Sequence, residues 1–365
     1  MVTRTLPGPN AFKLGLFGLN TDGGIAITKV PERWRAHWDE IADVARMVDE
    51  AGFDFLLPIA RWKGYGGETN VRNACFETLT QSSALAAITR RLFIFSTVHV
   101  PLVHPVFAAK ALSTIDHVSH GRAGLNIVCG WHQVEFDMFG HVQSAHDTRY
   151  EQGQEWYDVV TRIFAGEGRP FDYKGRFYDL KGVSGEPAPV QRPHPLTMSA
   201  ASSPAGRAFA LRTSDLLFAT FRDLDKGRAA LAAIRAQSDA AGRTEPLGIC
   251  TAAHVVCRET DAEAEAYYRH YAETNMDADA VDFHIGSTKA NRIVDAQELD
   301  DRVRRAAGLS SYRLVGTPER IAEQLMAIHR AGFAGTTLSF VNFKTELPFF
   351  IARVLPLLRK AGLMA

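Results

Sequence analysis

Apolar and polar positions follow two alternating patterns along the chain. Short runs rich in Val, Ile, Leu and Phe are separated by segments in which apolar residues recur every three or four positions. The runs are typical of strands buried on both faces, and the segments between them are typical of amphipathic helices. Together they predict a parallel sheet covered by helices. Eight strands are expected: Lys13–Leu19, Phe53–Ile59, Leu92–His99, Gly124–Cys129, Leu196–Ala200, Asp215–Thr220, Leu247–Val256 and Thr336–Val341.

The segment from Trp38 to Gly52 shows the helical pattern clearly. Ile41, Ala45 and Val48 follow Trp38 at helical spacing, and Gly52 is placed to end the helix just before the next strand. Repetition of this strand and helix unit predicts an α/β fold, and at 365 residues one barrel with insertions is as consistent with the pattern as two domains.

Three segments are longer than a minimal barrel needs. They cover about residues 60–75, 142–195 and 258–312, and the second contains a predicted hairpin around Phe171–Tyr178. Long insertions at barrel loops usually form lids or substrate walls. Active sites of such barrels lie at the carboxyl ends of the strands, where Thr97 and Asn126 stand, so both are candidates for catalysis.

Composition narrows the classes of partner. The 365 residues include 41 basic and 41 acidic side chains, a balance that gives no reason to expect nucleic acid, so a small-molecule substrate is expected. No signal peptide or membrane-spanning apolar run is recognised, which predicts a cytoplasmic protein. The four cysteines lack metal-binding spacing, so reduced core thiols and no metal are expected.

Common catalytic motifs are absent from the sequence. It has no G-x-S-x-G elbow, no H-E-x-x-H, no phosphate loop and no G-x-G-x-x-G opening a helix. The first strand ends in Gly18-Leu19-Asn20, without the H-x-H pair of many metal-binding barrel hydrolases, which disfavours that class. Without a dinucleotide fingerprint, an oxidoreductase of this kind needs a separate reductase to supply its reducing equivalents.

Several short motifs, in order along nearly the whole chain, carry a resemblance to a known family. They are Phe53-Asp54-Phe55, Gly64-Tyr65-Gly66-Gly67, Thr114-Ile115-Asp116, Gly121-Arg122, the stretch from Asn126 to Trp131 with Glu135, Arg149-Tyr150, and Val315-Gly316-Thr317-Pro318. The chain resembles the bacterial luciferase-like flavin monooxygenases. Within them it is most similar to the pyrimidine monooxygenases of uracil catabolism and to the dimethyl sulfone and alkanesulfonate monooxygenases.

This resemblance implies a single (β/α)8 TIM barrel over residues 1–365 that binds FMN, used in its reduced form with dioxygen. It also implies a separate NAD(P)H-dependent flavin reductase and a homo-oligomer, either dimer or tetramer. Eight residues are implied to contact the cofactor or its surroundings: Ala60, Arg61, Asn126, Glu135, Arg149, Tyr150, Ser202 and Ser203.

The Ser202-Ser203 pair also has a physical argument of its own. It opens a predicted helix, and free backbone N–H groups and the helix dipole at such a position favour an anion such as a phosphate. The competing interpretation is an ordinary N-cap, and Pro204 at the first helical position fits both. Ala200-Ala201 depart from the glycine-rich loop common in the relatives.

Thr97 and Asn126 carry the most specific expectation. In the uracil-degrading relatives a threonine and an asparagine at matching positions resemble a pair that holds dioxygen beside flavin N5. The sulfone-type relatives tend to have a small apolar residue where Thr97 stands. The resemblance therefore implies a nucleophilic flavin peroxide, at N5 on this interpretation, with C4a left open. Thr97 as an ordinary strand residue and Asn126 as a buried structural amide are the alternatives.

Other polar residues are weaker candidates. His132 follows Gly130-Trp131 in the site segment and is considered for acid–base catalysis, although loop histidines are often structural donors. Planar or anionic substrates could be bound by a cationic and aromatic loop or by a residue past the sixth strand. These substrate candidates are Arg61, Lys63, Tyr65 and Arg222.

Three functions remain open on the sequence. The first is a two-component FMN-dependent monooxygenase that oxidatively cleaves a carbon–heteroatom bond in a small, planar heterocyclic or aromatic substrate. The second is a sulfone- or alkanesulfonate-type monooxygenase of the same family. The third is a flavin- or deazaflavin-dependent dehydrogenase that does not activate oxygen.

Overall fold

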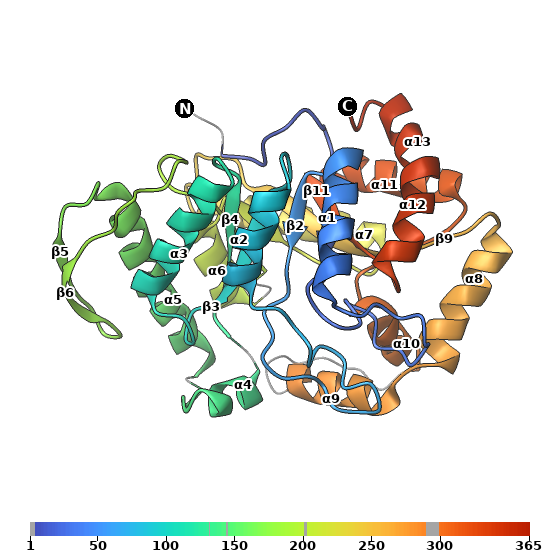
Figure 1. The fold of residues 1–365 in the computed structure, drawn as a ribbon, viewed down its shortest axis with the longest axis horizontal. Coiled ribbons are helices and arrows are strands. Elements are labelled where there is room, and N and C mark those ends of the chain that lie inside the picture. The colour runs from blue at the N-terminus through green and yellow to red at the C-terminus, as the bar shows by residue number, and fades with distance from the viewer. Residues whose placement is uncertain (1–3, 131, 144, 201–202, 290–298) are drawn as a thin grey trace.

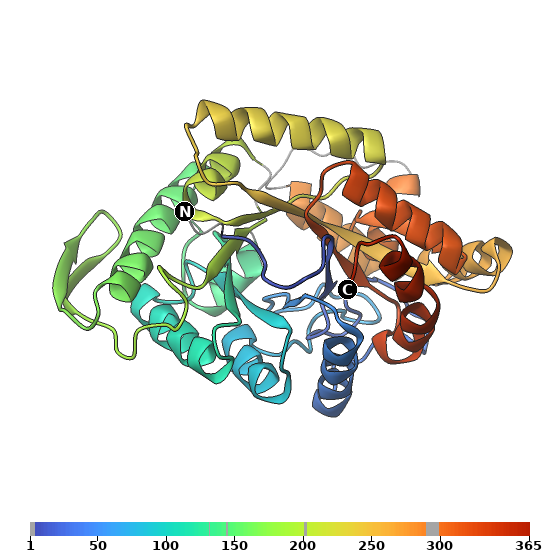
Figure 2. The same ribbon diagram turned by 90° about the horizontal axis from the view of Figure 1, so that it is seen from above.

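Eight parallel strands form a closed barrel, seen end-on in Figure 2. The structure is a computed structural model that describes residues 4–130, 132–143, 145–200, 203–289 and 299–365. The expected (β/α)8 barrel and its eight strands are confirmed. In their order around the barrel, with the last paired to the first, they are β1 (Lys13–Phe17), β2 (Phe55–Leu57), β3 (Phe93–His99), β4 (Ala123–Val128), β7 (Leu196–Ser199), β8 (Leu216–Phe218), β9 (Gly248–Cys257) and β11 (Gly335–Ser339).

The interior of the barrel is packed rather than open. Phe55, Phe93 and Phe95 pack inside it with apolar residues of the other strands, and Leu6 of the N-terminal segment closes one end. A Cβ atom on Gly124 of β4 would lie 2.5 Å from the Phe95 ring, so glycine makes room for that ring. Because side chains alternate along a strand, Thr97 follows Phe93 and Phe95 toward the barrel interior.

Helices surround the barrel and continue the alternation predicted from the sequence (Figures 1 and 2). The helices are α1 (Trp38–Ala51), α2 (Thr78–Ile88), α3 (Pro105–Val118), α4 (Gln133–Met138), α5 (His146–Ala165), α6 (Pro204–Thr213), α7 (Leu224–Ala240), α8 (Asp261–Arg269), the π-helix η1 (His270–Thr274), α9 (Ala278–Lys289), α10 (Leu299–Gly308), α11 (Pro318–Arg330), α12 (Phe343–Arg353) and α13 (Leu355–Lys360).

Helix α5 lies within residues 142–195 but occupies a place in the helical layer, where it contacts both α3 and α6. The part of this segment that leaves the layer is the antiparallel hairpin of β5 (Phe171–Lys174) and β6 (Asp179–Val183), at the left edge of Figure 1. The hairpin expected around Phe171–Tyr178 is therefore present.

A further parallel strand, β10 (Tyr312–Gly316), was not expected from the sequence. It pairs with the second half of β9, while the first half of β9 pairs with β8 inside the barrel. Along one edge, the ten residues of β9 thus pair first with β8 and then with β10, while the other edge pairs with β11. This arrangement connects the cap of α8, η1, α9 and α10 to the barrel wall. The strand was missed because it follows directly on a long polar segment.

Candidate active site

Thr97 and Asn126 face each other where β3 and β4 approach the barrel mouth. The two residues are register partners in the parallel pair β3–β4, and the Asn126 Nδ2 atom donates a hydrogen bond to Thr97 Oγ1 at 3.1 Å. Thr97 Oγ1 in turn donates to the carbonyl oxygen of Pro58 at 2.6 Å. These two hydrogen bonds fix both side chains relative to the end of β2.

The second polar atom of the Asn126 amide remains available. Asn126 is 5% exposed, and its Oδ1 atom has no hydrogen-bond partner among the described residues. A buried carbonyl oxygen without a donor is costly, by roughly 1–3 kcal/mol, unless a ligand or water supplies one. The orphaned acceptor therefore marks a place where a ligand N–H or O–H is expected.

Glu135 of α4 organises the neighbouring wall. Its Oε1 atom accepts hydrogen bonds from the Arg61 Nη1 atom at 3.1 Å and from the backbone N–H of Trp62 at 2.8 Å. These bonds hold the loop after β2 against α4, although the two segments are far apart in sequence. Although burial alone would raise it, the hydrogen bond from His132 and the charge of Arg61 lower the pKa of Glu135 to about 2.

Two histidines flank the same carboxylate. His99 Nδ1 lies 3.5 Å from Glu135 Oε2, and His132 Nδ1 lies 3.5 Å from Glu135 Oε1. Burial lowers the pKa of His99 to about 4, which outweighs the opposing effect of the Glu135 charge, so the ring is neutral at pH 7. His132 packs edge-on against the Tyr65 ring. The sequence analysis ranked His132 above the other histidines, His99 among them. His99 stands two residues after Thr97 on the same inward face of β3.

The neutral state of His99 predicts acid sensitivity. Its pKa is depressed in the folded protein, so protonation favours the unfolded chain, and stability is full above pH 6.5 and falls as the pH drops toward 4. The loss is at most about 3 kcal/mol for such a shift. Replacing His99 by Gln should flatten this part of the curve of unfolding free energy against pH, measured by urea denaturation; an unchanged slope would contradict it.

The predicted phosphate site is described in part. Ser203 caps α6, where its Oγ atom accepts from the Gly206 N–H at 3.2 Å and lies 3.5 Å from the Tyr150 hydroxyl. Arg149, buried on α5 beside Tyr150, donates from Nη1 to the carbonyl oxygen of Gly130. Ser202 lies outside the described residues. Ser203 and Tyr150 are thus brought together at a helix N-terminus suited to an anion.

A cleft opens beside Thr97 and His99. It encloses about 410 Å³ including its mouth and is also lined by Ala60, Arg61 and Trp62. This cleft therefore brings together Thr97, His99 and Arg61 with the start of α2. Sites for small molecules have this character, with a few convergent polar groups in a partly apolar cleft.

The predicted substrate residues are not gathered in this cleft, apart from Arg61. Lys63 is exposed on the loop. Tyr65 is buried, stacks on His284 of α9 and accepts a 2.6 Å hydrogen bond from Arg72. Arg222 Nη1 lies 2.5 Å from Asp301 Oδ1, so its charge is balanced within the chain.

Metal ligands do not assemble in the part of the chain that the structure describes: no group of three His, Cys, Asp or Glu side chains could hold an ion there. The four cysteines are free thiols. Over the same residues no helix has the length and apolar character required to cross a membrane.

Comparison with known proteins decides the family. The model of the luciferase-like monooxygenases matches residues 13–335. The chain belongs to the luciferase-like monooxygenase family. It is an oxidoreductase of this family, as the resemblance of its motifs implied.

Two groups of characterised relatives are similar over almost their entire length. An FMNH(2)-dependent dimethylsulfone monooxygenase of Pseudomonas putida is 30% identical over 351 residues, which are 93% of each chain. Pyrimidine monooxygenase RutA of Caulobacter vibrioides is 28% identical over 360 residues, covering 96% of this chain and all of the relative. Both relatives belong to the groups singled out from the sequence.

Solved structures support the fold of this luciferase-like chain. DmoA from Hyphomicrobium sulfonivorans has a TM-score of 0.84 at 21% identity, covering 96% of this chain and 89% of DmoA. Riboflavin lyase RcaE, solved with modified FMN and riboflavin, has a TM-score of 0.82 at 22% identity, with 97% and 92% covered. At this level of identity the likeness concerns the barrel and its cap rather than the substrate.

The described residues suit the cofactor that the resemblance implies. Asn126 offers a buried acceptor without a partner among the described residues, and Ser203, close to the Tyr150 hydroxyl, caps the start of a helix, a position suited to an anion. A flavin mononucleotide has a ring with N–H donors at one end and a phosphate at the other. The Asn126 acceptor thus suits the N–H groups of the ring, and the helix start suits the phosphate.

Proposed function

We propose that the protein is a two-component monooxygenase that uses reduced FMN and dioxygen to cleave a carbon–heteroatom bond oxidatively in a small, planar heterocyclic or aromatic substrate. The observation that carries this proposal is the Thr97–Asn126 hydrogen bond at the barrel mouth, with Asn126 Oδ1 left open toward a ligand. The names of the relatives support the cofactor, since the sulfone monooxygenases are described as FMNH(2)-dependent.

Each part of the site has a role in this proposal. Reduced FMN, when bound, supplies the electrons that activate dioxygen. The hydrogen bonds from Asn126 to Thr97 and from Thr97 to Pro58 fix the Asn126 amide, and the second hydrogen on its Nδ2 atom can stabilise negative charge that develops on dioxygen beside the pair. Arg61, positioned by Glu135, places a positive charge on the same wall. A fixed set of dipoles needs little reorganisation during the reaction.

In this proposal another protein supplies the electrons that reduce FMN. We expect a separate NAD(P)H-dependent flavin reductase that delivers reduced FMN, because the sequence contains no dinucleotide-binding fingerprint. A homo-oligomeric state and a cytoplasmic location remain predictions.

The decisive experiment is an anaerobic mixing study. The protein is loaded with chemically reduced FMN, dioxygen is admitted, and the flavin spectrum and products are followed with planar nitrogen heterocycles, dimethyl sulfone and alkanesulfonates. We expect oxygen-dependent product from the heterocyclic or aromatic compounds. If no compound yields an oxygen-dependent product, the monooxygenase proposal fails.

A sulfone-type monooxygenase is the second candidate. It is favoured by the higher identity to the dimethylsulfone monooxygenase, 30% against 28% for the pyrimidine enzyme. On this alternative the Thr97 hydroxyl is dispensable, and Thr97→Ala should barely alter turnover of a sulfone.

The phosphate site gives a matched pair of variants. Ser203 and Thr317 both cap a helix that has proline at its first position, but Thr317 belongs to α11 and has no place in the proposed site. Replacing either by Ala should cost about 1 kcal/mol of stability. Ser203→Ala should in addition weaken FMN binding about tenfold, because one hydrogen bond to a charged group contributes about 1.5–3 kcal/mol. Flavin fluorescence titration measures the effect, and equal affinities of the two variants would refute the assignment.

A further inference from the structure

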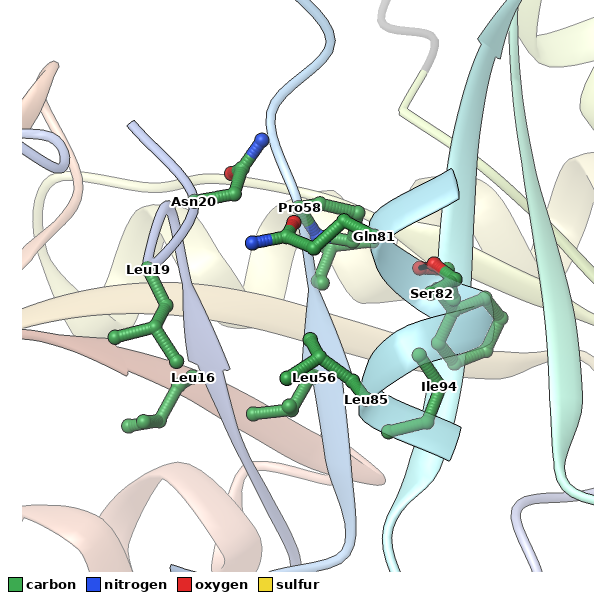
Figure 3. Close-up of a pocket in the computed structure, with 11 residues that line it drawn as sticks. Leu16, Leu19, Asn20, Leu56, Pro58, Gln81, Ser82, Leu85 and Ile94 are labelled. Atoms are coloured by element: carbon green, nitrogen blue, oxygen red, sulfur yellow. Dashed lines mark hydrogen bonds between the residues drawn. The ribbon is translucent and has the colours of Figure 1, made fainter. Parts of the chain in front are cut away.

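A small cavity lies behind the wall of the active site, between the outer face of β1–β3 and helix α2. Figure 3 shows Leu16, Leu56 and Ile94 of the three strands lying opposite Leu85 of α2, with Gln81 reaching over them. Its free core has room for about one molecule of the size of water.

The cavity and the active-site cleft follow each other along the same three elements. On each element, a residue that lines the cavity has one that lines the cleft within three positions, later in the chain on the two strands and earlier on α2. The pairs, cavity residue first, are Pro58 and Ala60 after β2, Phe95 and Thr97 on β3, and Ser82 and Leu79 on α2. The two hollows are therefore neighbours along a single seam between sheet and helix.

Thr97 stands where the two hollows meet. It lines the cleft, and its Oγ1 atom donates to the carbonyl oxygen of Pro58, which lines the cavity. A molecule that leaves the cavity toward the cleft therefore enters the hollow that Thr97 lines.

The mostly apolar lining of the cavity favours an apolar molecule. The Nε2 atom of Gln81, which is 5% exposed, has no partner among the described residues. The other polar side chains of the lining, Asn20 and Ser82, already make hydrogen bonds to the backbone. Buried waters typically make about three hydrogen bonds, and empty apolar cavities stay dry and bind xenon. A small uncharged gas gives up no hydrogen bonds to water when it enters such a space.

We propose that this cavity is a resting site for dioxygen on a route that reaches the active site through the wall beside Thr97. The inference rests on the use of dioxygen in the proposed function. It assigns a task to residues on the outer face of the strands, which take no part in the cofactor site. Because the interior is otherwise close-packed, gas is expected to move along such voids.

Xenon tests the site directly in the wild-type protein. Crystals held under xenon pressure should show a xenon atom among Leu16, Leu56 and Leu85. An ordered water on Gln81 that persists under xenon, with no xenon in the cavity, would overturn the proposal.

Kinetics test the route. Leu85→Phe fills the cavity, whereas Leu112→Phe makes the same change at a buried position of α3 outside the cavity. Filling the void should slow the reaction of bound reduced FMN with dioxygen about tenfold, since a close-packed interior offers few other voids as resting sites. Leu112→Phe should keep the wild-type rate, FMN affinity should be unchanged in both variants, and Leu85→Ala should react at least as fast as wild type.

The outcomes separate the two proposals. If wild-type protein with reduced FMN forms no oxygen-dependent product, the proposed function is wrong. If wild type reacts but folded Leu85→Phe reacts equally fast, the gas route is wrong while the function stands. Should Leu85→Phe fail to fold, the xenon result on wild type decides.

Discussion

Asn126→Ala should lower turnover by about two to three orders of magnitude, the loss found when one positioned donor is removed from a site that stabilises developing charge. The variant loses both the bond to Thr97 Oγ1 and the open Oδ1 acceptor at the barrel mouth. Product formation from pre-reduced FMN, measured in single turnover, reports the effect without a reductase.

Thr97 variants complete this test. Thr97→Ala removes the hydroxyl that connects Asn126 to Pro58 and should abolish most product while FMN binding is largely kept. Thr97→Ser keeps the hydroxyl and should retain most of the activity. Turnover of Asn126→Ala within a few-fold of wild type, with normal folding by circular dichroism, would show that the pair has a structural role alone.

Glu135→Ala should destabilise the protein by about 3–5 kcal/mol, because it leaves the buried Arg61 guanidinium without its carboxylate. The backbone N–H of Trp62 also loses its acceptor. Urea unfolding at pH 7 measures the change. Glu151→Ala is the matched control, since Glu151 pairs with Arg176 on the exposed surface and its loss should cost less than about 1 kcal/mol.

The contribution of Glu135 to folding stability is confined to a defined pH range. Its pKa is lowered in the folded protein, so the stability it provides is full above the ordinary value of 4.5 and is lost as the pH falls toward 2. Wild type and Glu135→Ala should therefore approach each other in stability below pH 4.5. A gap that stays constant down to pH 2 would contradict ionisation of this carboxylate in the folded state.

The sequence was informative where a local pattern of apolar residues determines the structure. Strands such as β3 and β4 are apolar on both faces, so their ends, and with them Thr97 and Asn126, could be placed from the pattern alone. The register that pairs these two residues was not predicted from the sequence and is seen only in the structure.

The sequence was less informative where distant segments meet. Asp301 of α10 reaches Arg222, and His284 of α9 stacks on Tyr65, through a cap whose path no local pattern specifies. His99 was undervalued for a related reason. A histidine inside a strand looks structural until the carboxylate of Glu135, on a different element, is found beside it.

The plugged end of the barrel has a kinetic implication. Leu6 and the phenylalanine layer fill the barrel below Thr97, so that end offers no solvent path among the described residues. Cofactor and organic substrate would then reach the polar pair from the same side of the barrel. Excess organic substrate should therefore compete with reduced FMN for entry, and raising the concentration of reduced FMN should relieve this inhibition in steady-state kinetics.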